Sequence, residues 1–348
     1  MEARLVDELP TGRAWQYEPK WDGFRCLVFW DGGAVDLRSK AGKSLARYFP
    51  DVATAIAALG VKRCVLDGEL VVPEENELSF DQLLQRIHPA ASRVRMLAAS
   101  HPALFIVFDI LVDARGKSLT ALPLSLRRRA LEAFADAYLA DQSSMHPPAV
   151  ILSPMTCDAR RVRAWLRAGR GGLDGVVAKR TDLPYESGTR DGMQKVKQYR
   201  TADCVVGGFR YASKPQAGRR VVGSLLLGLY DDAGLLQHIG FTSALSSAER
   251  IPLTRRLERL VAPPGFTGRA PGGPSRWSTE RTADWKPLKP SLVVEVTYDH
   301  FSDGRFRHGT GLVRWRPDKA PQQCTFEQIA PAGRSSLQLL RRRGTIRR

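Results

Sequence analysis

Apolar residues repeat with two different periods along the chain. In the first 200 residues, helical spacing alternates with extended apolar runs, which is typical of a fold that mixes helices with β-sheet. Two of these runs flank Asp31-Gly32-Gly33, a turn that tolerates positive φ, and they predict a β-hairpin. The predicted strands are 24–30, 34–38, 64–72, 104–111, 175–179 and 194–198, and the predicted helices are 50–59, 80–87, 124–139 and 158–168.

Two of these elements carry expectations about burial. The run 104–111 is apolar on both faces, which indicates a strand inside a sheet. The helix 124–139 has one apolar stripe, from which its three consecutive arginines are mostly excluded. The stripe consists of Leu126, Ala130, Leu131, Phe134 and Tyr138, and the arginines are Arg127, Arg128 and Arg129.

From residue 203 onward the pattern changes to short strands, with one helix at 246–260 and a Pro/Gly-rich loop at 262–277. Short strands separated by turns are typical of a small β-barrel. We therefore place a domain boundary near residues 200–203. The strands predicted in this part are 205–210, 224–230, 237–240 and 292–298.

Charge adds a polyanionic partner to this picture. The 348 residues include 53 Lys+Arg and 36 Asp+Glu, a net charge of +17. Residues 1–200 contribute 29 basic and 24 acidic side chains, a net of +5, whereas residues 201–348 contribute 24 and 12, a net of +12. The second part therefore favours nucleic-acid binding, although a solvated basic tail would have the same composition. Ordinary hydrophobic and charged fractions, 43% and 26%, exclude a largely disordered or fibrous chain.

Five dispersed cysteines form no CxxC pair, which argues against a zinc ribbon or a disulfide scaffold and fits a reducing compartment. No apolar stretch approaches the ~18 residues of a membrane span. The first residues contain no apolar core of a signal peptide. We therefore expect a cytoplasmic protein.

Three common catalytic signatures are missing from the sequence. The triplets at 42–44 and 116–118 read GKS, but leucine stands where a phosphate loop needs its earlier glycine. The six histidines form no HExxH pair, and no GxSxG elbow occurs. Zincin and serine-hydrolase chemistry are thereby disfavoured, and any ATP site must be of another kind.

The segment Glu18–Arg25, EPKWDGFR, places Lys20 between two carboxylates and ahead of a glycine turn and an arginine. A protonated lysine is a poor nucleophile because its pKa is ordinarily about 10.4. Nearby carboxylates raise that pKa, so activation needs neighbouring cations or desolvation. A surface lysine with ordinary salt bridges remains the alternative for this segment taken alone.

Other segments add chemistry that suits a nucleotide. Each is common by itself: a carboxylate pair for a metal ion or a ribose, an aromatic ring for a base, and cations for a triphosphate. Alternation along a strand directs both lysines of 195–197 to one face, where they could lower the pKa of a neighbouring lysine. The segments are Arg38–Gly42, Asp67-Gly68-Glu69, Phe108-Asp109, Asp174–Lys179, Lys195-Val196-Lys197 and Arg314–Lys319.

Taken in order with Glu18–Arg25, these segments resemble the covalent nucleotidyltransferases. More closely the chain is similar to the ATP-dependent DNA ligases, and most of all to the small core-only C-type bacterial ligases and the ligase module of bacterial end-joining enzymes. The resemblance covers about residues 5–319. It implies an α+β fold: a mixed or antiparallel-sheet, ATP-grasp-like nucleotidyltransferase (adenylation) domain at 1–201, then a small OB-fold β-barrel at 202–330 and a basic tail at 331–348.

The resemblance also implies an activity, the sealing of 5′-phosphate/3′-hydroxyl nicks in duplex DNA through a lysyl-AMP intermediate and an adenylated DNA end. By this resemblance Lys20 is the nucleophile, and the other matched residues bind the nucleotide. Glu18 would lie near adenine, Phe108 would stack on it, Arg25 and Arg38 would contact ribose or phosphate, Glu69 would take the ribose, and Lys195 and Lys197 would grip the α-phosphate. Arg314, Arg316, Asp318 and Lys319 would orient the pyrophosphate leaving group.

The implied cosubstrate is ATP, with Mg²⁺ or Mn²⁺ held at Glu69 and Asp174. The implied partner is nicked duplex DNA, and a repair polymerase or an end-binding protein is a further partner of this type of enzyme. We expect a monomer associated with the nucleoid, without a membrane partner.

The sequence departs from the family at two places. Asp174 stands where the family usually has glutamate, which shortens a metal-binding carboxylate by one methylene. Gly309-Thr310-Gly311 replaces proline and bulkier residues, and predicts a more flexible edge of the barrel.

Three other functions compete with this interpretation. An NAD-dependent ligase is disfavoured because only 19 residues precede Lys20 and no zinc-finger cysteines follow. RNA ligases and capping guanylyltransferases share the lysine chemistry, and nothing local decides the sugar. A DNA-binding module with an inactive nucleotide site is disfavoured by the full set of phosphate-facing cations.

Overall fold

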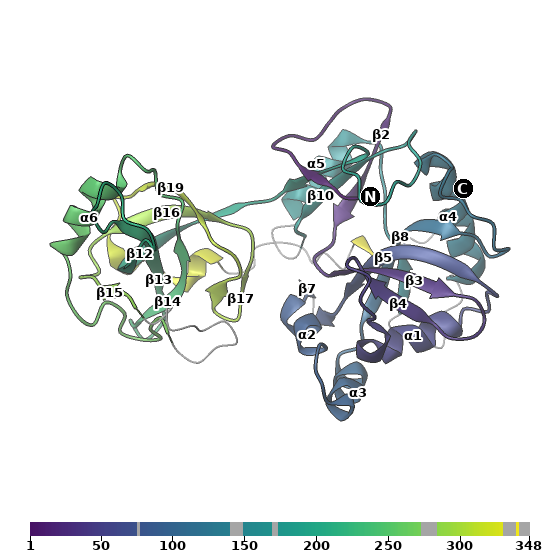
Figure 1. The fold of residues 1–348 in the computed structure, drawn as a ribbon, viewed down its shortest axis with the longest axis horizontal. Coiled ribbons are helices and arrows are strands. Elements are labelled where there is room, and N and C mark those ends of the chain that lie inside the picture. The colour runs from purple at the N-terminus through teal and green to yellow at the C-terminus, as the bar shows by residue number, and fades with distance from the viewer. Residues whose placement is uncertain (75–76, 140–148, 169–172, 273–283, 330–338, 341–348) are drawn as a thin grey trace. The chain divides into compact units, whose positions relative to one another are not determined.

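The computed structural model describes the chain except for residues 75–76, 140–148, 169–172, 273–283, 330–338 and 341–348 (Figure 1). The chain divides into two compact units. Unit 1 comprises Met1–Gln198 together with 332–348, and unit 2 comprises Tyr199–Pro331. Within the described residues, no helix has the length and apolar character of a membrane span.

Unit 1 contains a five-stranded, mainly antiparallel sheet. Its strands are β3 (Phe24–Trp30), β4 (Asp36–Ser39), β5 (Cys64–Val71), β8 (Leu104–Val112) and β9 (Val150–Leu152), in the order β4-β3-β5-β8-β9. The predicted hairpin is confirmed because β3 and β4 pair antiparallel. β8 lies inside the sheet, between β5 and the parallel β9, as its two apolar faces indicate.

A second sheet of unit 1 has four strands, two of which were not predicted from the sequence. The strands are β1 (Arg4–Leu5), β2 (Trp15–Lys20), β10 (Gly175–Arg180) and β11 (Met193–Lys197), in the order β1-β11-β10-β2. Neither β1 nor β2 was predicted: β1 is only two residues long, and although WQYEPK alternates apolar and polar residues, Pro19 weakens its strand signal. β10 pairs with β2 on one side and with β11 on the other, and it therefore lies at the centre of the site described below.

The helices of unit 1 include two that differ from expectation. They are α1 (Pro50–Ala57), α2 (Phe80–Gln85), α3 (Ala91–Ser100), α4 (Leu124–Tyr138) and α5 (Ala159–Ala168). α3 was not predicted. In α4 the predicted stripe is wrong at three positions, because Leu126 is exposed while Arg127 and Arg128 are buried. Arg127 pairs with Asp109 on β8, and this partner lies outside the helix, where periodicity cannot show it.

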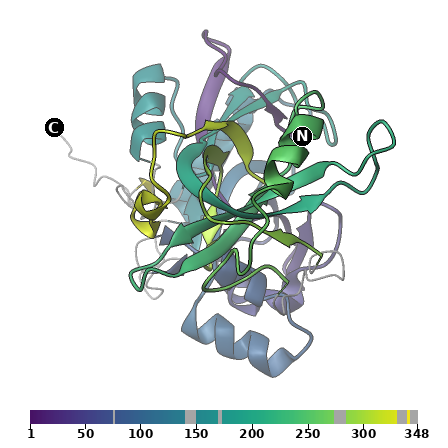
Figure 2. The same ribbon diagram turned by 90° about the vertical axis from the view of Figure 1, so that its left-hand side faces the viewer.

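Unit 2 is a strand-rich unit around one apolar core. Its strands are β12 (Arg200–Tyr211), β13 (Val222–Tyr230), β14 (Leu236–Thr242), β15 (Lys286–Pro287), β16 (Val293–Tyr298) and β19 (Gly311–Trp315). They form one sheet in the order β14-β13-β12-β16-β19, and β15 also pairs with β12. The helix α6 (Arg250–Glu258) packs on β13. Figure 2 faces this unit and shows its green strands twisting across one another. Much of the predicted loop 262–277 is described, but residues 273–277 lie outside the described part.

The sheet of unit 2 approaches closure without completing a barrel among the described residues. Its outer strands β14 and β19 meet at one parallel bridge between Thr242 and Thr310. The Thr242 hydroxyl donates to the Thr310 carbonyl over 2.8 Å, and both side chains are buried. Thr310 belongs to the Gly-Thr-Gly segment, so a small residue run lies where the two edges come together.

The remaining described elements are short. They are β6 (Pro73–Glu74), β7 (Glu77–Leu78), β17 (Phe301–Ser302), β18 (Arg305–Phe306) and the 3₁₀ turns at Ala46–Tyr48, Pro321–Gln323 and Phe326–Ile329.

Candidate active site

Lys20 is the last residue of β2, at the point where β2 meets the start of β10. The Lys20 carbonyl accepts a hydrogen bond from the Asp174 amide over 3.2 Å, and Gly175 lies directly opposite Lys20 in the ladder. The Lys20 ammonium donates to the Asp174 carboxylate, although 154 positions separate them in the chain. The predicted lysine and the predicted carboxylate are therefore direct partners.

Two glycines of the motifs are required by close approach of backbone. A Cβ at Gly23 would lie 2.1 Å from the Leu70 carbonyl oxygen, and one at Gly175 would lie 2.0 Å from the Val196 oxygen. Gly175 also has φ of +145°, which side chains rarely adopt. The glycines thus bring β5 and β11 against the ends of β2 and β10, where the chemistry-bearing residues lie.

A cavity of about 480 Å³ opens beside Lys20 in unit 1. Six of the residues predicted from the sequence line it, namely Glu18, Lys20, Arg25, Glu69, Phe108 and Lys195. The described lining also contains residues for which the sequence predicts no role, among them Glu2, Arg4, Lys40, Lys179, Arg190 and Met193. The cavity size suits a nucleotide-sized ligand.

The wall of this cavity is set by strand register. Val177 at the centre of β10 lies opposite Glu18 on β2 and opposite Lys195 on β11. The three residues therefore form one row across the sheet. Because side chains two apart share a face, Lys197 follows Lys195 on the same face, as predicted. The register turns segments from three distant parts of the sequence into one surface.

Glu18 is held by two neighbours before any ligand binds. Its carboxylate accepts from the Lys179 ammonium over 2.8 Å and from the Gln16 amide over 2.9 Å, and all three residues are buried. The Lys179 nitrogen also lies 4.3 Å from the centroid of the Phe108 ring. Lys179 ends the segment Asp174–Lys179, but only the register that pairs it with Gln16 shows its role beside Glu18.

The guanidinium of Arg25 makes several hydrogen bonds within the protein, in addition to its predicted role in contacting the ligand. Its guanidinium donates to both carboxylate oxygens of Asp67, at 3.1 and 2.7 Å, and to the Met1 carbonyl. The Tyr185 hydroxyl donates to the same Asp67 carboxylate over 2.8 Å. Arg25 therefore reaches the cavity as part of a fixed network, which also lies near Phe108.

Two ionisable groups of the cavity have pKa values shifted toward the neutral form. Burial raises the pKa of Glu69 to about 8, and the neighbouring Lys20 and Arg25 only partly oppose this shift. Burial also lowers the pKa of Lys195, and the positive charges of Lys20 and Lys197 add to the effect. Both shifts favour the neutral forms, and a bound anion or cation would reverse them.

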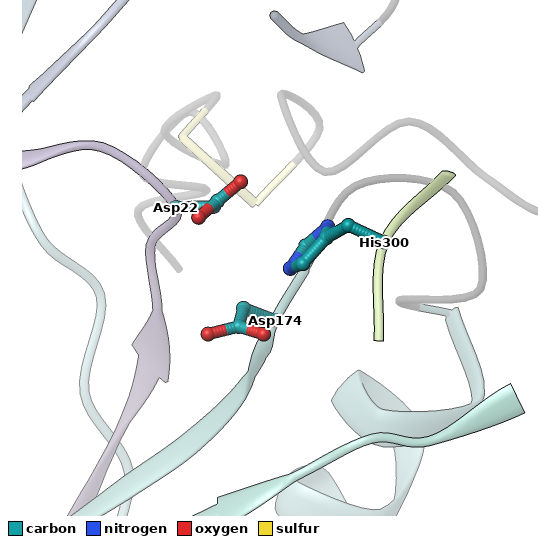
Figure 3. Close-up of side chains that lie close together, drawn as sticks. All are labelled: Asp22, Asp174 and His300. Carbon is teal, nitrogen blue, oxygen red and sulfur yellow. The ribbon is translucent and has the colours of Figure 1, made fainter. Parts of the chain in front are cut away.

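The candidate metal ligands include one residue that the sequence analysis did not assign. Asp22 follows β2 and Asp174 precedes β10, and Figure 3 shows both carboxylates in this region. One oxygen of Asp22 lies within 4.8 Å of one oxygen of Asp174. Carboxylate oxygens are the ligands that Mg²⁺ prefers, so this donor set fits a divalent cation.

Three predicted residues of unit 1 are not part of the described cavity lining, namely Arg38, Asp174 and Lys197. Asp174 and Lys197 lie next to it, because Lys197 comes within 3.8 Å of the Asp174 carboxylate that holds Lys20. Arg38 instead pairs with Asp36 over 2.6 Å, and 46% of its side chain is exposed. The neighbouring Lys40 lines the cavity in the same segment.

The segment Arg314–Lys319 belongs to unit 2, where acidic residues bind its cations. Arg316 and Lys319 both pair with Asp203 on β12, at 2.8 and 2.7 Å. Arg314 pairs with Glu295 on β16 over 2.7 Å. Arg316 also holds Asp318, and this pairing lowers the pKa of Asp318 to about 2. Asp203 lies 113 positions from Arg316 and was not among the residues predicted from the sequence.

Comparison with known proteins agrees with these features. Residues 4–197 match the family model described as the ATP dependent DNA ligase domain, and residues 218–319 match the ATP dependent DNA ligase C terminal region. The chain is 43% identical over 352 residues to DNA ligase C2 of Mycolicibacterium smegmatis, covering 97% of this chain and 95% of that protein. It is 32% identical to the multifunctional non-homologous end joining DNA repair protein LigD of Mycobacterium tuberculosis, covering 90% of this chain and 37% of that protein.

A solved structure described in a study of Lig E DNA ligases has the same fold. Its TM-score is 0.50 at 15% identity, covering 91% of this chain and 100% of that chain. The expected α+β fold and the resemblance to C-type ligases and to the end-joining ligase module are confirmed.

Proposed function

The chain belongs to the ATP-dependent DNA ligases, and from that premise we propose that Lys20 carries AMP during strand sealing. The single observation that carries the proposal is the contact of the Lys20 amine with Asp174 at the rim of a nucleotide-sized cavity. Lysine is the side chain at this position that can form a covalent bond to phosphorus.

In the first step the unprotonated Nζ of Lys20 attacks the α-phosphorus of ATP. A nitrogen–phosphorus bond forms, the bond to the β-phosphate oxygen breaks, and pyrophosphate leaves. Asp174, which accepts a hydrogen bond from this amine, takes the proton that is released. Lys195 and Lys197 neutralise the charge that develops on the non-bridging oxygens.

Two further displacements at phosphorus complete the proposed reaction. The 5′-phosphate of the nick attacks the lysine-bound AMP, which frees Lys20 and leaves an adenylated DNA end. The 3′-hydroxyl then attacks that end, the strand is sealed, and AMP leaves. Both steps depend on positioning and charge neutralisation, for which the cations around Lys20 are suited.

The other cavity residues bind the nucleotide in this proposal. Glu18, held by Lys179 and Gln16, accepts from the adenine amino group, and Phe108 stacks on the base. Arg25 contacts the ribose or the DNA phosphate from its network with Asp67. Glu69 takes the ribose, and Arg38 reaches phosphate or ribose after leaving Asp36.

A divalent cation, Mg²⁺ or Mn²⁺, is assigned to Glu69 and Asp174 as the resemblance implies, and Asp22 is added because its carboxylate lies within 4.8 Å of that of Asp174. When bound, it supplies positive charge near the phosphate oxygens. Arg314, Arg316, Asp318 and Lys319 of unit 2 orient the pyrophosphate. In this assignment residues 1–201 are the adenylation domain, 202–330 the OB-fold domain and 331–348 a basic tail, which apart from residues 339–340 lies outside the described part of the chain. The ligase acts as a monomer on nicked duplex DNA at the nucleoid, with a repair polymerase or an end-binding protein as a partner.

The experiment uses α-labelled ATP with Mg²⁺, followed by denaturing electrophoresis. We expect label on the wild type and on the control Lys62→Ala, an exposed lysine outside the cavity, but not on Lys20→Ala. Label that persists on Lys20→Ala would refute the nucleophile assignment. Acid release of AMP from the labelled protein identifies the bond as a phosphoramidate.

A further inference from the structure

We propose that Asp203 is the positioning residue that sets Arg316 and Lys319 for the adenylylation step. The inference rests on the proposed function, in which these two cations orient pyrophosphate. The Asp203 carboxylate accepts from Arg316 Nη1 at 2.8 and 3.0 Å and from Lys319 Nζ at 2.7 Å. One carboxylate therefore joins the two cations, although it lies outside every motif that the sequence shows.

The backbone of Asp203 is fixed from both sides. Its neighbour in the antiparallel ladder is Glu295 on β16. On the opposite edge the side-chain amide of Gln328 accepts from the Asp203 amide over 3.0 Å and donates to the Asp203 carbonyl over 3.2 Å. Because this amide takes the place of a strand, the carboxylate projects from a rigid point on the sheet rather than from a loop.

The ladder also places a second carboxylate beside the first. Asp203 and Glu295 are direct cross-strand partners, and like charges in such a pair repel unless cations lie between them. Arg314 binds Glu295 over 2.7 Å, and Arg316 lies 4.0 Å from the same carboxylate. The carboxylates of Asp203 and Glu295 thus form an acidic surface on β12 and β16, and the cations of Arg314–Lys319 bind to this surface.

The depth of these groups shows which side remains available to a ligand. The Asp203 side chain is 11% exposed, whereas those of Arg316 and Lys319 are 19% and 20% exposed. Asp318, the other partner of Arg316, is 62% exposed. Asp203 therefore holds both cations from the protein side. On the outer side Arg316 Nε and Nη2 donate to the exposed Asp318, so Arg316 donates to phosphate oxygens by exchanging this solvent-facing partner while its bond to Asp203 stays in place.

Fixing the two cations in advance has a kinetic consequence. Arginine and lysine side chains populate many rotamers, and ordering them on binding costs conformational entropy. When Asp203 has already ordered both, less of that cost falls on the transition state in which pyrophosphate leaves. Loss of Asp203 should thus slow the step that makes or consumes pyrophosphate and spare the steps that do not.

The test is Asp203→Asn, which keeps the shape of the side chain and removes its charge. We expect self-adenylylation from ATP to slow by roughly ten- to hundredfold. This is a smaller decrease in rate than the loss of a group that contacts the developing oxyanion directly would cause, because Asp203 acts through Arg316 and Lys319. Pyrophosphate-driven removal of AMP from pre-labelled protein, the reverse of the same step, should slow by the same factor. Sealing of a pre-adenylated nick should stay within about twofold of wild type, a change below ~0.4 kcal/mol.

Three variants frame the result. Glu258→Gln removes another hydrogen-bonded carboxylate of unit 2, the partner of Tyr211, and should leave all three rates unchanged. Glu295→Gln frees Arg314 and removes only the 4.0 Å contact of Arg316, whose bonds to Asp203 remain, so it should give a smaller loss than Asp203→Asn. Asp203→Glu keeps the charge but shifts it by one methylene, so it provides the same comparison of steps if Asp203→Asn does not fold.

The outcomes separate this inference from the assignment of Lys20. Unchanged or faster adenylylation in Asp203→Asn, or equal losses in adenylylation and in sealing of the pre-adenylated nick, would overturn the positioning role. Either result leaves the labelling of Lys20 untouched. Label on Lys20→Ala would instead refute the proposed function and would say nothing about the ion pairs of Asp203.

Discussion

The ion pair between Arg127 on α4 and Asp109 on β8 is the most deeply buried one in the described part of unit 1. The two side chains are 0% and 6% exposed, and the guanidinium donates to both carboxylate oxygens at 2.9 and 3.0 Å. Burial raises the pKa of Asp109, and Arg127 opposes that shift. Asp109→Asn keeps the side-chain shape but leaves the guanidinium buried without its counter-charge.

We expect Asp109→Asn to lower the free energy of unfolding by about 3–5 kcal/mol, the usual cost of breaking a buried pair. At about 2–4 °C per kcal/mol for a unit of this size, the melting temperature should fall by roughly 6–20 °C. Arg127 keeps its hydrogen bonds to the Leu122 and Leu183 carbonyls, which favours the lower part of that range.

Differential scanning calorimetry measures the effect, with Asp182→Asn as the control. Asp182 pairs with Arg180 on the surface, where solvent screens the charges, so its loss should leave the melting temperature nearly unchanged. Arg127→Met should cost less at pH 5.5 than at pH 8, because the buried Asp109 can then take up a proton. If Asp109→Asn lowers the melting temperature by less than about 2 °C, the reasoning that burial makes this ion pair costly to break is refuted.

Three further predictions follow from the site. The folded-state pKa of Glu69 is about 8, above its usual 4.5, so unit 1 should lose stability as pH rises between these two values. The melting temperature of Glu69→Gln should therefore change less with pH than that of the wild type between pH 5.5 and 8. Equal slopes for the two proteins would contradict the raised pKa. Arg316→Ala and Lys319→Ala should slow self-adenylylation at least tenfold more than sealing of a pre-adenylated nick, measured by gel assays of each step; equal losses would contradict that division. Gly175→Ala should lower the melting temperature and the adenylylation rate together, because its methyl would meet the Val196 carbonyl at 2.0 Å; near-normal values for both would show that the strands can separate without cost.

The local sequence pattern predicted an element correctly wherever the residues of that element alone determine its secondary structure and burial. The hairpin at β3 and β4 followed from two apolar runs around an Asp-Gly-Gly turn, and the interior position of β8 followed from its two apolar faces. The chemistry around Lys20 was also readable, because a lysine, carboxylates, an aromatic ring and paired cations occur in a fixed order along the chain. The cavity brings Glu18, Glu69, Phe108 and Lys195 to the same place as Lys20.

Other features depend on partners that the pattern does not contain. β2 alternates apolar and polar residues, but Pro19 weakens the strand signal, and the burial of its polar Gln16 and Glu18 arises in the sheet where β10 pairs with it along six residues. Arg127 and Arg128 lie on the buried side of α4, where Asp109 and the Ser153 carbonyl accept their hydrogen bonds. Hydrophobic periodicity predicts that arginine lies on the surface. This prediction fails where a buried carboxylate or carbonyl of another element accepts hydrogen bonds from the guanidinium.

The sequence by itself determined the kinds of group that this ligase uses and the order in which they occur, since these are properties of residue type and spacing. Tertiary structure alone decided which charges meet: Lys20 with Asp174, Glu18 with Lys179, and Arg316 with Asp203. The physical reason is that an ion pair depends on distance through space. Strand register, which no local pattern encodes, brings together carboxylates and cations that lie more than 100 positions apart in the chain.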